Sequence, residues 1–192
     1  MTRKILGIDP GSRNTGYAIL DIDGDSYSAE VCGVLRMDKM ENQTDRLQYI
    51  FEEISALINK FKPDECAVET PIYGVDPLAM LKLGRAQAAA ILAITNQSLP
   101  VEEYYPKAVK KAITGNGNAS KKQVAFMLDR MMTLPEEKMG NDATDALAVA
   151  WCHFTNTNHI TSNTGKKATH QNNRKSSWTA FVQDNPDRIK KH

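Results

Sequence analysis

The stretch ILGIDPGSRNTGYAIL, residues 5–20, places a carboxylate between two apolar runs. The first run predicts a buried strand that ends at Asp9, and the short turn after it predicts an antiparallel partner strand. A buried carboxylate without a partner costs several kcal/mol or takes up a proton. Asp9 therefore either serves a partner that needs its charge or is a plain turn residue.

The order of the predicted elements indicates the fold class. Strands are predicted at residues 5–10, 15–22, 28–37, 65–69 and 101–105, and helices at 41–61, 77–97, 106–113, 120–133 and from 142 onward. Short turns join the first three strands into an antiparallel meander, and the later strands alternate with helices. This order predicts an α/β fold with a mixed five-stranded sheet and helices on both faces.

Length and composition favour a soluble globular protein. The chain has 192 residues, of which 41% are hydrophobic and 24% charged. We expect no membrane-spanning stretch and no cleavable signal, and therefore a cytoplasmic location. The three cysteines, Cys32, Cys66 and Cys152, are isolated in apolar surroundings, so we expect reduced, buried side chains rather than disulfides or a zinc site.

The net charge of +1 is unevenly distributed. Residues 155–192 carry a net +5 and few apolar side chains, whereas residues 1–154 carry −4. We therefore expect a globular domain over 1–154 and a largely disordered tail over 155–192. The basic tail could add non-specific phosphate contacts. The charge of the globular part neither indicates nor excludes nucleic-acid binding, because local patches decide.

Four carboxylates stand at the ends of apolar elements. Asp9 and Glu69 each close a predicted strand, and Asp142 and Asp145 share one face at the start of the last helix. Converging like charges repel unless cations lie between them. Oxygen ligands without His or Cys favour Mg²⁺ or Mn²⁺, and two such ions about 4 Å apart cleave phosphodiesters by in-line displacement.

Each acid also has a purely structural interpretation. Asp142 is a natural N-cap, Asp145 suits the positive end of the helix dipole, and Asp9 suits a turn. Glu69 is harder to explain in this way, because Glu is a poor strand former that is seldom buried. The four together favour a metal site.

Four segments, LGIDPGSRNTGYAIL (6–20), CAVE (66–69), LKLGRAQAAAILA (81–93) and NDATDALAVA (141–150), resemble RuvC-type Holliday junction resolvases in order and spacing. The resemblance covers residues 4–154. It implies an RNase H-like fold and a homodimeric endonuclease that nicks two opposed strands of four-way junction DNA with Mg²⁺, for which Mn²⁺ is the expected substitute. It also implies a branch-migration motor as a partner. The family's catalytic acids fall on the four carboxylates above.

The resemblance also suggests DNA-binding residues. The family's lysines near the scissile strands fall on Lys110 and Lys121. Lys121 also follows a Gly-rich loop in the first turn of a helix, where phosphate is attracted, although both lysines could simply be solvated. Where the family often carries an aromatic residue three positions after the catalytic Glu, this chain has Ile72. The adjacent Tyr73 could stack on unpaired bases instead.

Other functions remain open at this point. A DPGS-type turn also occurs in actin-like ATPases and sugar kinases, but these need a second, similar half. A nuclease for RNA–DNA hybrids would share fold and metals, and a non-catalytic nucleic-acid-binding relative would be expected to have lost acids. The helix over 77–97 is apolar around most of its circumference, so a second copy of the chain or a neighbouring helix must cover its outer side.

Overall fold

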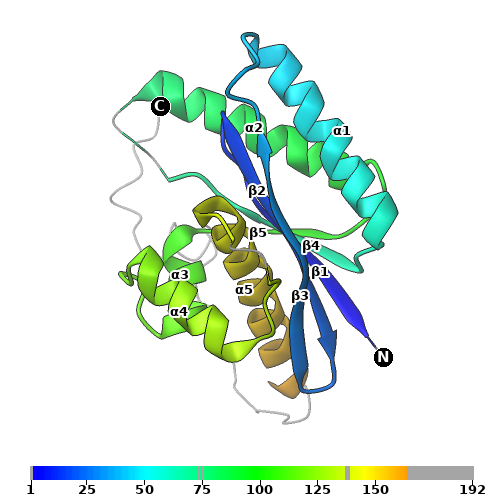
Figure 1. The fold of residues 1–192 in the computed structure, drawn as a ribbon, viewed down its shortest axis with the longest axis vertical. Helices are drawn as coiled ribbons and strands as arrows, with labels where there is room; N and C mark the ends of the chain where they lie inside the picture. Colours follow the sequence, from blue (N-terminus) through cyan, green and yellow to red (C-terminus); the bar gives the residue numbers. More distant parts are fainter. Residues whose placement is uncertain (1, 73, 75, 137–138, 164–192) are drawn as a thin grey trace, which may run out of the picture. The chain divides into compact units, whose positions relative to one another are not determined.

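The structure is a computed structural model of the chain and describes residues 2–72, 74, 76–136 and 139–163. Its elements are β1 (Arg3–Asp9), β2 (Asn14–Asp23), β3 (Ser26–Arg36), α1 (Gln43–Phe61), β4 (Glu65–Glu69), α2 (Pro77–Thr95), β5 (Val101–Tyr104), α3 (Pro106–Thr114), α4 (Lys121–Met131) and α5 (Asn141–Asn163). Figure 1 shows their arrangement. The predicted order of strands and helices is confirmed.

The five strands form one mixed sheet in the order β3-β2-β1-β4-β5. β1 pairs with β2, and β2 with β3, in antiparallel directions, whereas β4 runs parallel to both β1 and β5. This is the predicted combination of a meander with later parallel strands. It puts β1 and β4 side by side at the centre of the sheet.

Helices cover both faces of this sheet. Figure 1 shows α1 and α2 on one face and α3, α4 and α5 on the other. Because side chains alternate along a strand, Leu6 and Ile8 of β1 pack toward α1 and α2, while Ile5 packs toward α5. Asp9 lies four positions after Ile5, so its side chain points to the same face of the sheet, which α5 covers.

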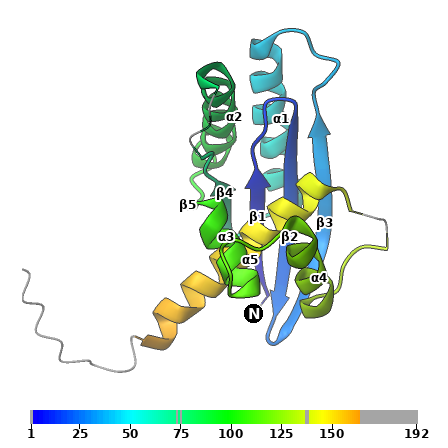
Figure 2. The same ribbon diagram turned by 90° about the vertical axis from the view of Figure 1, so that its left-hand side faces the viewer.

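Helix α5 lies directly on the strands at two glycines. A Cβ at Gly7 of β1 would come within 2.1 Å of the Ala146 carbonyl oxygen, and one at Gly16 of β2 within 2.0 Å of the Asp142 carbonyl oxygen. In Figure 2 the helix runs obliquely across the strands. The two glycines therefore set how closely α5 approaches the sheet.

Gly7→Ala is expected to lower the free energy of unfolding by about 3 kcal/mol or more, at the upper end of overpacking costs, because the added methyl meets helix backbone that cannot rotate away. Gly84→Ala is the matched control. At Gly84, in α2, a methyl meets nothing within 4 Å, so the substitution should add up to about 1 kcal/mol of stability. Urea unfolding measures both. Equal effects in the two variants would contradict the close packing of α5.

The end of α5 differs from the expected boundary after residue 154, because the helix continues to Asn163. Thr and Asn side chains replace apolar contacts here. Thr155 and Asn156 donate to the Cys152 carbonyl, and Thr157 donates to the His153 carbonyl. The rest of the expected tail, 164–192, lies outside the described residues, and its disorder stays a prediction.

Helix α2 is more apolar than the sequence expectation allowed. By length and composition alone it could cross a membrane, with a mean hydropathy of 1.3, a property that core helices of soluble proteins share. One side packs in the core through Ala86, Ala90 and Ile94.

The expectation of buried cysteines holds for Cys66 and Cys152, which are buried, whereas Cys32 is only partly buried.

Candidate active site

The strand register brings two of the four predicted acids together. Ile8 of β1 lies beside Val68 of β4 in the parallel pair, so the next residues, Asp9 and Glu69, lie side by side where the two strands end. Both carboxylates are partly buried on the face covered by α5. A parallel pair at the centre of the sheet is therefore what joins residues 60 positions apart.

The first turns of α5 supply the other two acids. One carboxylate oxygen each from Asp9, Asp142 and Asp145 lie within 4.8 Å of one another. Glu69 lines the same cavity of about 260 Å³ as Asp9 and Asp145. The structure thus gathers all four predicted acids at one location, where the closeness of Gly16 to the Asp142 carbonyl holds the helix end near the strands.

Burial and mutual repulsion disturb the titration of this cluster. Burial, and then the charge of Asp145, raise the pKa of Asp9 to about 6. Burial, and then the charges of Asp9 and Asp145, raise the pKa of Glu69 to about 8. Lys121 opposes both shifts but does not cancel them. Without a bound cation, the site therefore favours the protonated forms of Asp9 and Glu69.

These raised pKa values predict how the stability of the metal-free protein changes with pH. Asp9 and Glu69 keep protons in the folded chain at pH values where the unfolded carboxyls, with pKa near 4, have lost them. Their stabilising contribution is therefore full below about pH 4 and is lost as the pH rises through about 6 and 8.

Urea unfolding in a chelator, from about pH 5 to about pH 9, measures this effect as the difference between the wild-type chain and Asp9→Asn. The wild-type chain should lose stability relative to the variant as the pH rises. A relative gain of stability would show that the carboxylates do not repel one another in the folded state.

Two predicted lysines face the acids. Lys121, in the first turn of α4, forms a hydrogen-bonded ion pair with Asp145. The hydrogen bond to Asp145 raises the pKa of the lysine. A capping box between Ser120 and Gln123 fixes the start of the helix. Lys110 of α3 lines the same cavity. Neither lysine is therefore only a solvated residue on a helix face.

Ile72, another predicted DNA-binding position, does not line this cavity. It follows β4 and is 53% exposed. Tyr73 lies outside the described residues. Sequence reasoning missed Thr15, a fully buried residue whose hydroxyl accepts from the Gly11 N–H and donates to the Gly11 carbonyl, thereby bracing the turn after Asp9. A threonine just beyond that turn was the available signal.

The donor set fits a divalent metal ion. Carboxylate oxygens are the ligands that hard cations prefer, and three of them are within reach of one position. Burial first, and repulsion second, raise the pKa of Asp9 and Glu69, and a bound cation would favour the charged carboxylates that ligate it. A mixed sheet in this strand order, with acids at the ends of β1 and β4 and on α5, defines an RNase H-like nuclease.

The family model for the crossover junction endodeoxyribonuclease RuvC matches residues 5–153. The chain belongs to this family. The RuvC protein of Salinibacter ruber is 44% identical over 96% of this chain and 98% of its own length. That of Porphyromonas gingivalis is also 44% identical, over 98% and 97%.

Solved structures agree with this membership. Thermus thermophilus RuvC, solved in complex with a Holliday junction substrate, is 27% identical, with a TM-score of 0.76 over 83% of this chain and 97% of that chain. The yeast mitochondrial Holliday junction resolvase shares the fold, with a TM-score of 0.61 over 85% of this chain and 86% of that chain at 14% identity.

Proposed function

We propose that this chain resolves four-way DNA junctions in recombination and repair, by metal-dependent nicking of two opposed strands. The observation that carries the proposal is the convergence of Asp9, Asp142 and Asp145, with Glu69 in the same cavity, on a RuvC-family fold. The solved complex of Thermus thermophilus RuvC with a Holliday junction substrate supports the choice of DNA.

The four acids are the proposed catalytic residues and metal ligands. They would hold two Mg²⁺ ions per site, with Mn²⁺ as a substitute, since their oxygens suit small hard cations. The bound ions would supply acidity to the attacking water and charge neutralisation at the leaving oxygen. The carboxylates themselves would hold the ions in place at the ends of β1 and β4 and the start of α5.

The lysines would bind the DNA backbone. Lys121 neutralises Asp145 in the free protein and is 63% exposed, so its ammonium group is free to turn toward a phosphate. Lys110, which lines the same cavity, would contact the same strand. Ile72 and Tyr73 stay candidates for contacts with bases at the crossover. A branch-migration partner and a cytoplasmic location also stay proposals from the family resemblance.

A nicking assay separates the alternatives. A synthetic mobile four-way junction, an RNA–DNA hybrid and a linear DNA duplex are incubated with the protein and Mg²⁺. We expect paired nicks on opposed strands of the junction alone. Cleavage of the hybrid without cleavage of the junction would favour the ribonuclease, and junction binding without any nick would favour the non-catalytic relative.

The exposed side of α2 supports a homodimer. Leu78, Leu81 and Leu92 are 67%, 50% and 60% exposed, and no described element covers them, α1 included. Together with Arg85 and Ala88 they follow alternate steps of three and four residues, which places them on one stripe. A second copy of the chain would bury this stripe in an isologous contact and supply the two-fold axis that symmetric nicking needs.

A further inference from the structure

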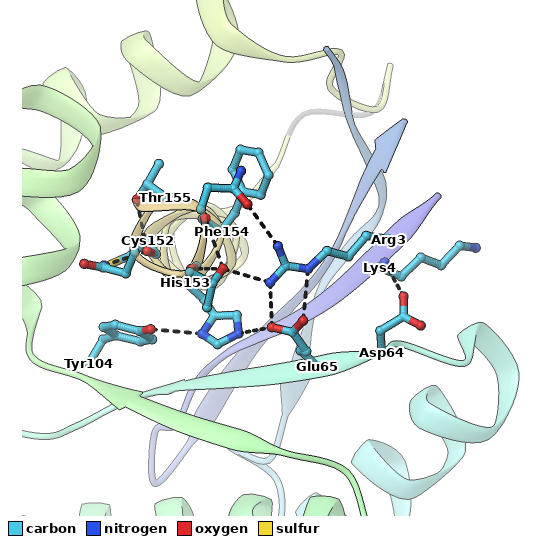
Figure 3. A network of polar contacts seen from close by, with 12 residues as sticks. Arg3, Lys4, Asp64, Glu65, Tyr104, Cys152, His153, Phe154 and Thr155 are labelled. Atoms are coloured by element: carbon cyan, nitrogen blue, oxygen red, sulfur yellow. Dashed lines mark hydrogen bonds and ion pairs between the residues drawn. The ribbon is translucent and has the colours of Figure 1, made fainter. Parts of the chain in front are cut away.

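A polar network joins α5 to three strands away from the carboxylate cavity. Its members are Arg3 of β1, Glu65 of β4, Tyr104 of β5 and His153 of α5, and we call it the polar clamp (Figure 3). These are buried or partly buried residues, and none of them lines the cavity of the acids among the described residues.

His153 is the centre of the clamp. It is only 3% exposed, and its two ring nitrogens contact different strands: Nε2 lies 2.5 Å from a Glu65 carboxylate oxygen and Nδ1 lies 2.9 Å from the Tyr104 hydroxyl. Burial raises the pKa of Glu65, but hydrogen bonds from Arg3 and His153 outweigh it, so the pKa lies below its ordinary value. Glu65 is therefore an acceptor, and His153 donates to it through Nε2.

The remaining bonds close the network. Burial raises the pKa of Tyr104 to about 12, so its hydroxyl keeps its proton at neutral pH, and it forms a hydrogen bond with His153 Nδ1. Arg3 donates to both oxygens of Glu65, at 3.0 and 2.6 Å, and to the Thr157 hydroxyl at 2.8 Å. Each bond has a direction, so together they resist rotation and sliding of the helix, which apolar packing alone tolerates.

The clamp connects the same elements that carry the acids. β1 and β4 hold Asp9 and Glu69 at one end and Arg3 and Glu65 at the other. On α5, His153 follows Asp142 by about three helical turns, so both side chains face the sheet. Because a helix is rigid along its axis, any axial displacement of α5 at the clamp would also displace Asp142 and Asp145.

We propose that the polar clamp is a positioning network, which fixes the rotation and axial position of α5 and so holds Asp142 and Asp145 against the strand-end acids. The proposal rests on the proposed function of the four acids. One carboxylate oxygen each from Asp9, Asp142 and Asp145 lie within 4.8 Å of one another, so the position of α5 decides the geometry of the cluster. Displacements of about 1 Å cost roughly 100-fold in rate.

Three variants of the full-length chain test the clamp. His153→Phe keeps an aromatic ring and removes both hydrogen bonds, whereas His153→Gln keeps an N–H that can reach Glu65. Trp151→Phe is the control, because Trp151 is buried two positions away and its indole N–H has no hydrogen-bond partner among the described residues. For each we would measure the Mn²⁺ dissociation constant by calorimetry without DNA, the melting temperature, and single-turnover nicking of the junction.

His153→Phe is expected to weaken Mn²⁺ binding by about 10-fold or more and to slow nicking by about 10- to 100-fold. His153→Gln should recover most of both. Trp151→Phe should lower the melting temperature and leave Mn²⁺ binding unchanged. If His153→Phe does not fold, Glu65→Gln takes its place, with the same expected losses.

Mn²⁺ binding within about twofold of wild type in the clamp variant would overturn the proposal and leave the network a purely structural one. A wild-type chain that binds no Mn²⁺ would overturn it as well. A wild-type chain that binds Mn²⁺ but nicks no junction would instead overturn the proposed function. The Mn²⁺ comparison would then still decide whether the clamp positions the acids.

Discussion

Replacing Asp9 with asparagine is expected to abolish junction nicking and to leave the fold and junction binding intact. The amide keeps the size of the side chain but removes a charge at the centre of the carboxylate cluster. Loss of one electrostatic contribution of this kind typically costs about 100- to 1,000-fold in rate, and a lost metal ligand costs at least as much. Binding should survive, because phosphate contacts come from basic side chains.

Single-turnover nicking and gel-shift binding of the same junction measure the two effects. Asp129→Asn, an exposed carboxylate on α4, is the matched control and should nick as the wild type does. The melting temperature of Asp9→Asn in a chelator should equal or exceed that of the wild type, since the variant relieves repulsion. An Asp9→Asn chain that nicks at the wild-type rate would remove this carboxylate from the active site.

Charging the exposed stripe of α2 is expected to convert the dimer into a folded monomer. In the double variant Leu81→Glu and Leu92→Glu, both new carboxylates would be buried without partners at a two-fold contact, which costs several kcal/mol. In the monomer the same side chains stand in water, so the fold should tolerate them. Sedimentation at micromolar concentration measures the change.

Junction resolution should fall when the dimer is lost. A monomer would nick one strand at a time, so the share of junctions cut on both opposed strands in one binding event should drop toward zero. Phe126→Glu, a charge on an exposed residue of α4, should leave sedimentation unchanged. A wild-type chain that stays monomeric with and without junction, or a double variant that stays dimeric, would contradict the proposed interface.

Most of the site could be predicted from the sequence because its acids occupy positions with strong local signals. Asp9 and Glu69 end apolar runs, and Asp142 and Asp145 lie three residues apart at a helix start. Strand and helix periodicities are local properties, so the order of elements could also be predicted. A parallel β1–β4 pair then brings the first two acids together without further information.

The contacts that hold the site in place depend on tertiary structure alone. Gly7 is needed because α5 crosses β1 at that residue, and no local pattern specifies where a helix crosses a strand. His153 and Glu65 are 88 positions apart, and their bond depends on strand register and helix rotation together. The exposure of the leucines on α2 could not be predicted from the sequence either, since the pattern of an apolar helix does not reveal which side the sheet covers.

The sequence by itself therefore determined the elements and the four acids, because hydrophobic periodicity and strand-end charge are encoded locally. Only the tertiary structure decided how deeply α5 lies on the sheet, that it continues to Asn163, and which polar residues fix it. The physical reason is that these features arise from pairings between segments far apart in the chain. Their geometry exists only once the strands are in register and the helix has docked.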